Sequence, residues 1–140
     1  MHISNVDGSD KQILTSQQAG YEMCSWSPDG SQIAITREMS DNSELWLITP
    51  EGEDILQLTT DPARDYWPAF SPDGSKIAFT SNRSGNYDIW VLDLISMELT
   101  QITDNPTTDN QPCWSPDGSA LLFASMRRSS QDLWLYTFED

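Results

Sequence analysis

Apolar and polar positions along the chain fall into short runs that recur every 44 residues. Three of the runs are continuously apolar: Leu45-Trp46-Leu47-Ile48, Ile89-Trp90-Val91-Leu92 and Leu133-Trp134-Leu135-Tyr136. A strand with one face in water alternates apolar and polar side chains, so a continuous run predicts a strand that is buried on both faces. Turn-forming residues interrupt the chain every ~8 to 12 positions, and no long segment has a helical period. The pattern predicts an all-β chain.

A tight-turn sequence keeps the same 44-residue step. It occurs as Trp26-Ser27-Pro28-Asp29-Gly30, Phe70-Ser71-Pro72-Asp73-Gly74 and Trp114-Ser115-Pro116-Asp117-Gly118. Proline fixes the second turn position, aspartate bonds to nearby backbone, and glycine supplies the positive φ of the reversal. Apolar residues on both sides make each turn the tip of a β-hairpin. We therefore assign a structural role to Pro28, Asp29, Gly30, Pro72, Asp73, Gly74, Pro116, Asp117 and Gly118.

Each period is predicted to form four short strands. In the second period these cover residues 66–70, 76–81, 87–94 and 99–103. Four-stranded units at this spacing are typical of β-propeller blades. The chain then divides into a partial repeat with strands three and four (1–15), a first blade (16–59), a second blade (60–103) and a third blade that lacks its fourth strand (104–140), all within one propeller domain.

The repeat resembles the WD40-like (PD40) repeat of the TolB family, which also occurs in the propellers of prolyl oligopeptidase-type and tricorn-type proteases. The residues that carry the resemblance are Ser71-Pro72-Asp73-Gly74, then 76–85, then Asp88-Ile89-Trp90-Val91-Leu92-Asp93. The resemblance implies a six-bladed ring and a non-enzymatic scaffold for protein–protein interaction in the bacterial envelope. The chain departs from TolB-like proteins in two respects, since we find no separate α/β domain and no export signal in it.

The predicted blades are too few to close a ring, because propellers have ~4 to 8 of them. An open set leaves apolar faces and a strand edge in water, which favours association. We therefore expect a homodimeric six-bladed ring with twofold symmetry, in which residues 12–15 of one chain complete the blade at 104–138 of the other. Residues 1–6 duplicate a strand already present at the far end, so we expect them to be displaced or added at an edge. The alternative is an excised half of a larger TolB-type or peptidase-type propeller.

The charge and hydropathy of the chain restrict the classes of partner that it can bind. The chain has 22 acidic and 7 basic residues, a formal charge of −15, which argues against nucleic acid and anionic lipid. No apolar run approaches ~18 residues, so no membrane insertion is expected. The first 15 residues lack a signal-peptide pattern, which favours the cytoplasm, with the periplasm as the alternative for a fragment of a TolB-like protein.

Candidate chemistry is sparse. His2 is the one histidine, and there is no Gly-x-Ser-x-Gly elbow, metal-ligand cluster or nucleotide-binding loop. We therefore expect no enzyme activity, no catalytic residue, no metal and no cofactor. A propeller that binds a ligand or processes carbohydrate or peptide in its channel is the alternative. Cys24 and Cys113 have no disulfide or metal spacing and are interpreted as small buried apolar residues.

Two clusters are candidate binding sites. All five arginines (Arg37, Arg64, Arg83, Arg127 and Arg128) fall in or beside connections expected at one end of the propeller, where they could bind a protein or peptide partner. Local pairing with loop carboxylates is the favoured alternative for Arg83 and Arg127. Tyr21, Asp65 and Asp109 begin the first strands at the channel mouth, where two copies would gather four aspartates suited to Ca²⁺; solvated channel residues are the alternative.

Overall fold

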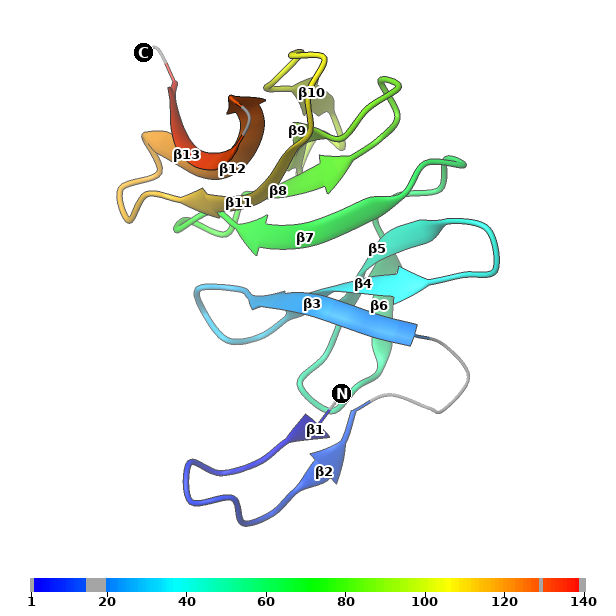
Figure 1. Cartoon of the computed structure of the whole chain (residues 1–140). Helices are drawn as coiled ribbons and strands as arrows, with labels where there is room; N and C mark the ends of the chain where they lie inside the picture. The colour runs from blue at the N-terminus through cyan, green and yellow to red at the C-terminus, as the bar shows by residue number, and fades with distance from the viewer. Residues whose placement is uncertain (1, 15–19, 129, 139–140) are drawn as a thin grey trace.

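The computed structural model describes residues 2–14, 20–128 and 130–138, and for residues 3, 20–22 and 128 it describes the backbone only (Figure 1). These ranges contain strands and connecting turns, and no helix in them is long and apolar enough to cross a membrane. Parts of the predicted units, namely residues 1, 15–19, 129 and 139–140, lie outside the described residues.

Three antiparallel sheets follow one another along the chain, each built from consecutive strands (Figure 1). The first contains β3 (Gly20–Trp26), β4 (Ile33–Glu38), β5 (Ser43–Ile48) and β6 (Asp54–Gln57). The second contains β7 (Asp65–Phe70), β8 (Lys76–Ser81), β9 (Asp88–Asp93) and β10 (Leu99–Gln101). The third contains β11 (Asp109–Trp114), β12 (Ala120–Arg128) and β13 (Ser130–Thr137). The third sheet thus has three strands, and the prediction of an all-β chain with blade-like repeats is confirmed.

A short hairpin precedes these sheets. Its strands, β1 (His2–Ile3) and β2 (Gln12–Ile13), pair antiparallel and lie on the side of the first sheet away from the other two (Figure 1). Leu14 follows β2 and is buried against the first sheet, beside Ile33, Ile35 and Ile48. The expectation that residues 1–6 are displaced or added at an edge takes this form in the single chain: β1 pairs with β2.

The core lies between the sheets and not within any one of them. One cluster joins Ala34, Leu45 and Leu47 of the first sheet to Ile77 and Phe79 of the second. A second cluster repeats this contact one sheet further along, and it contains Ala78, Ile89, Val91, Leu121 and Phe123. A continuously apolar third strand is therefore buried only where sheets cover both of its faces.

The first strand of every sheet carries a β-bulge at the same place. Met23, Trp67 and Gln111, each 44 residues from the next, have φ values of 50°, 51° and 56° in breaks of the β3, β7 and β11 registers. A bulge re-aims the strand and leaves one residue unpaired. In the third sheet the freed Gln111 amide donates to Thr80 Oγ1 of the second sheet at 3.2 Å, so the bulge also joins neighbouring sheets.

The prediction that both cysteines are buried is wrong, because both are exposed. The counterparts of Cys24 one and two repeats later are Pro68 and Pro112, which are buried. The counterpart of Cys113 one repeat earlier is Ala69, whose carbonyl accepts a hydrogen bond from the next sheet. Each cysteine is therefore exposed because it lies on a flank that lacks the neighbour its counterparts have.

Candidate interaction surfaces

The Ser-Pro-Asp-Gly turns line one end of the molecule and share one geometry. In the first, the Gly30 amide donates to the Ser27 carbonyl at 2.9 Å, and Gly30 has φ +73°. Asp29 Oδ1 accepts from Ser27 Oγ at 2.6 Å and from the Ser31 amide at 3.0 Å. These serine hydrogen bonds hold the pKa of Asp29, Asp73 and Asp117 at about 2. The aspartates therefore have a structural function in the turn.

Successive turns also touch one another. A Cβ added at Gly74 would meet Pro28 at 3.4 Å, and one at Gly118 would meet Pro72 at the same distance. At Gly30, by contrast, nothing lies within 4 Å. A proline over the next glycine is thus a sheet-to-sheet contact, and the first turn has no preceding proline to complete it.

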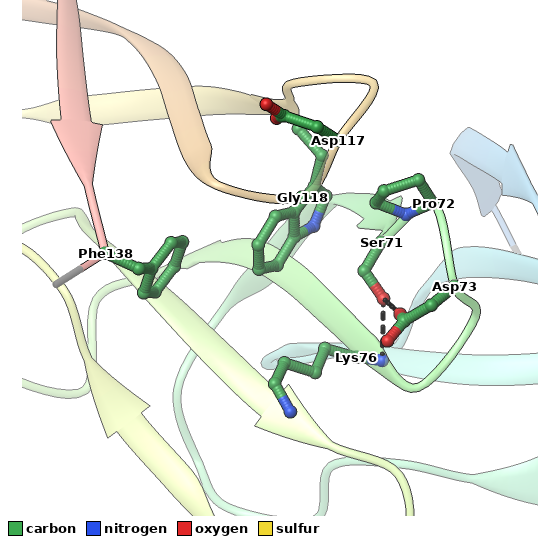
Figure 2. Close-up of a pocket in the computed structure, with 8 residues that line it drawn as sticks. Ser71, Pro72, Asp73, Lys76, Asp117, Gly118 and Phe138 are labelled. Carbon is green, nitrogen blue, oxygen red and sulfur yellow. Dashed lines mark hydrogen bonds between the residues drawn. The ribbon is translucent and has the colours of Figure 1, made fainter. Parts of the chain in front are cut away.

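A cavity of about 320 Å³ opens between the second and third turns (Figure 2). Trp114 and Phe138 stack there with ring centroids 5.3 Å apart, and Lys76, which also lines the cavity, forms an ion pair with Asp93 at 2.8 Å. A smaller cavity of about 250 Å³ occupies the same place between the first two turns. Because a cavity recurs at this place with different lining side chains, we interpret both cavities as a feature of sheet-to-sheet packing.

Buried ion pairs occupy the opposite end, where the first strands begin. Asp65 and Asp109 are both 0% exposed. Arg83 Nη2 lies 2.8 Å from Asp65 Oδ2, and Arg127 Nη2 lies 2.6 Å from Asp109 Oδ2. Arg83 also pairs with Asp61 at 2.9 Å. Burial raises the pKa of Asp65 despite its arginine partner.

These pairs bear on two of the sequence-based assignments. Arg83 and Arg127 are tied to carboxylates of their own sheets, which agrees with local pairing, so we leave them out of the partner-binding set. The carboxylates of Asp65 and Asp109 each pair with an arginine, and the described residues of the single chain contain no group of three or more possible metal ligands. The predicted Ca²⁺ site needs aspartates from two copies and stays a prediction. The side chain of Tyr21, the third member of that set, lies outside the described residues.

The first sheet replaces this ion pair with other residues. One repeat before Asp65 and Arg83 stand Tyr21 and Met39, so both charges are absent together. Arg37, two positions earlier on β4, stacks over Trp46 at 4.2 Å and pairs with Asp54. In the other sheets, Arg83 and Arg127 stack over the equivalent tryptophans, Trp90 and Trp134, at 5.3 and 4.6 Å. An arginine on the tryptophan is therefore retained although its position in the sequence shifts.

Arg64 and Arg128 remain as candidates for a partner-binding face. Arg64 lies in the β6–β7 connection and is exposed, and its backbone amide donates a hydrogen bond to Asn82 Oδ1 at 2.8 Å. Arg128 ends β12, and its side chain lies outside the described residues.

A buried glutamate lies near the ion pairs, and sequence reasoning did not single it out. Glu44 on β5 accepts from Thr59 Oγ1 at 2.6 Å and from Asn42 Nδ2 at 2.5 Å. Burial, followed by the charges of Asp65 and Asp61, raises the pKa of Glu44 to about 7, against the opposing effect of the Thr59 hydrogen bond. Asp88 repeats the arrangement with Thr103 one sheet later. An acidic residue followed 15 positions later by a threonine recurs at the 44-residue step, and this recurrence could have identified Glu44 from the sequence.

The outer face of the third sheet is apolar and uncovered. We call the surface of Leu122, Leu133 and Leu135 the open face. Leu133 is 72% exposed and Leu135 is 65% exposed, whereas Ile89 and Leu45, the counterparts of Leu133 in the other two sheets, are 0% exposed. In the single chain the third apolar run is thus covered on one face only, because no sheet follows the third one in the described residues.

Antiparallel sheets of consecutive strands, stacked face to face with their first strands in mutual contact, define the chain as part of a β-propeller. The family model for the TolB beta propeller domain (PD40) matches residues 1–140, and the chain belongs to this family. The resemblance stated from the sequence is therefore confirmed.

Solved structures agree with this assignment. The chain is similar to TolB from Acinetobacter baumannii, with 27% identity and a TM-score of 0.87, over 98% of this chain and 34% of that one. A structure assigned as TolB from Agrobacterium tumefaciens has 24% identity and a TM-score of 0.78, with 91% and 48% covered. An oligogalacturonate lyase in complex with manganese has 18% identity and a TM-score of 0.73, with 96% and 40% covered. The chain thus spans less than half the length of each, and no curated protein matches it.

Proposed function

We propose that this chain is a non-enzymatic scaffold for protein–protein interaction that pairs with a second copy of itself to complete a six-bladed ring. The observation that carries the proposal is the open face. Leu133 and Leu135 are uncovered, although the repeat places their counterparts in blade-to-blade contacts. An apolar surface of this kind, built to be covered by another blade, favours association.

The flank of the first sheet offers the complementary surface. Trp26 is exposed, whereas its counterpart Trp114 donates from Nε1 to the Ala69 carbonyl of the preceding sheet at 3.1 Å. In the same register, Trp26 of a second copy would meet the Cys113 carbonyl. Pro116 would likewise lie over Gly30 of that copy, as Pro28 lies over Gly74. Trp26 and Gly30 on the flank of the first sheet therefore have matching groups on the flank of the third sheet, namely the Cys113 carbonyl and Pro116.

The absence of catalysis in this proposal rests on how the polar groups are used. His2 is exposed on the terminal hairpin, and the inner carboxylates of Asp65 and Asp109 are buried against arginines. The likeness to the lyase, at 18% identity, supports the fold alone.

Charge opposes the pairing that apolar contact favours. Each chain carries a formal charge of −15, so two copies repel one another at low ionic strength. Because salt screens this repulsion and leaves the apolar contact intact, the dimer is expected to strengthen as salt is raised.

Light scattering coupled to gel filtration tests the proposal. The wild-type chain should elute at twice its 15.8 kDa mass at high protein concentration. The variant Leu133→Asp/Leu135→Asp should elute as a folded monomer, since both side chains are exposed in the single chain. The matched control is Ile95→Asp, which adds a charge at an exposed apolar residue away from the open face and should leave the dimer intact. A wild-type chain that stays monomeric, or a double variant that still dimerises, would overturn the proposal.

A further inference from the structure

The terminal hairpin copies the outer strand pair of a complete blade. β1 and β2 lie 44 residues before Trp46-Leu47 of β5 and Leu56-Gln57 of β6. His2 pairs with Ile13 and Ile3 with Gln12, while Trp46 pairs with Gln57 and Leu47 with Leu56. The two registers are the same, so β1 holds the position beside β2 that strand three holds in a whole blade.

A second strand, β13, could also occupy the position beside β2. β13 spans Ser130–Thr137 and is the last strand of its sheet, so its outer edge bears no strand in the described part of the chain. In the repeat, Trp134 and Leu135 correspond to Trp90 and Val91, which pair with Gln101 and Thr100 of β10. The same register would place Leu135 opposite Gln12.

We propose that β1 is a placeholder strand: in the assembled ring, β2 leaves β1 and pairs with β13 of a second copy. This inference rests on the proposed function and names the exchange by which that ring forms. β1 and β13 would pair with the same edge of β2, so β1 must dissociate before β13 can pair there. The single chain keeps β2 covered through β1, and the dimer releases β1.

The contacts around β2 favour such an exchange. Among the described residues, β1 pairs with β2 at two positions, and strand three pairs with strand four at three positions in each complete blade. Leaving β1 therefore loses no more backbone pairing than β13 can restore. The exposed Leu133 and Leu135 would be covered at the same time by the first sheet of the second copy, as the next sheet covers their counterparts.

Leu14 holds β2 in place during the exchange. It is buried beside Ile33, Ile35 and Ile48, and its backbone lies against Gly52, where an added Cβ would come within 2.0 Å of the Leu14 carbonyl oxygen. One repeat later, Leu58 fills the same place and contacts both adjoining sheets. β2 is thus already positioned at the flank where the second copy would dock.

A disulfide between copies tests the pairing directly. In a Cys24→Ser/Cys113→Ser background, Gln12→Cys combined with Leu135→Cys should give a covalent dimer on oxidation that reduction dissolves. The control combines Gln12→Cys with Ile95→Cys, whose exposed side chain lies away from the open face, and should give no covalent dimer.

A disulfide within the hairpin tests the displacement. In the same background, His2→Cys with Ile13→Cys joins directly paired residues of β1 and β2. The oxidised form should elute as a monomer and the reduced form as a dimer. The exchange is overturned, and the proposed dimeric ring is kept, by two results together. The oxidised hairpin variant still dimerises, and the Gln12→Cys/Leu135→Cys variant forms no disulfide between copies. A wild-type chain that never dimerises overturns both.

Discussion

The second and third sheets are built from the same repeat and differ in what covers them. Ile89 and Leu133 hold equivalent positions 44 residues apart, yet the first is 0% exposed and the second 72% exposed. Both sheets have the same turn, the same bulge and the same aspartate–arginine pair. The apolar residues of strand three therefore serve contact between blades, since the third sheet keeps its strand pairing with one face open.

The largest difference is expected when an aspartate replaces Ile89 in one variant and Leu133 in another. Ile89→Asp buries an unpaired carboxylate between two sheets and should lower the free energy of unfolding by more than about 5 kcal/mol, enough to unfold many domains. Leu133→Asp should change it by less than about 0.5 kcal/mol in the monomer. Urea unfolding followed by tryptophan fluorescence measures both. Equal losses would show that the open face is part of the monomer core.

A second test concerns the ion pair that the second and third sheets share and the first lacks. Arg83→Met leaves Asp65 buried without its partner and should cost about 3–5 kcal/mol. Adding Asp65→Leu removes the stranded charge and should recover more than half of that loss. Met39→Ala, at the exposed counterpart in the first sheet, is the control and should have little effect. A full double-mutant cycle by urea unfolding gives the coupling, and strictly additive losses would contradict a shared role.

Glu44 distinguishes the first sheet by a pH dependence. Its folded pKa of about 7 lies above the ordinary value of 4.5, so the folded state binds the proton more tightly than the unfolded state. Its contribution to stability is therefore full below pH 4.5 and is lost as the pH rises toward about 7. Glu44→Gln cannot ionise, and its stability relative to wild type should increase across this window. Melting temperatures of both proteins across the window measure the difference, and parallel curves would refute the assignment.

The smallest effect is expected at the turns, which are alike in all three sheets. The pKa of Asp73 is lowered to about 2 by its serine hydrogen bonds, so its contribution is present above the ordinary value of 3.8 and is lost as the pH falls toward about 2. Asp73→Asn should reduce the acid sensitivity of unfolding, and because Asp29 and Asp117 titrate in the same range, part of it should remain. Acid titration followed by circular dichroism tests this, and an unchanged acid transition would contradict it.

The repeat, and hence the division into blades, could be predicted from the sequence alone. Every Ser-Pro-Asp-Gly segment forms a turn through bonds among neighbouring residues, such as Ser27 with Asp29, and local chemistry of this kind can be predicted from spacing. The family could be recognised for the same reason, because the residues that match it are turn and core residues.

The surroundings of each repeat, by contrast, depend on how the sheets stack. Arg83 and Arg127 are neighbours of acidic loops in sequence, but only the fold buries Asp65 and Asp109 and pairs each with one of these arginines. Leu133 and Ile89 have the same local pattern, and only the presence or absence of an adjacent sheet separates them. Local turns depend on residues a few positions apart, whereas burial depends on surfaces brought together from different blades, so the sequence pattern specified the first and the stacking of the sheets the second.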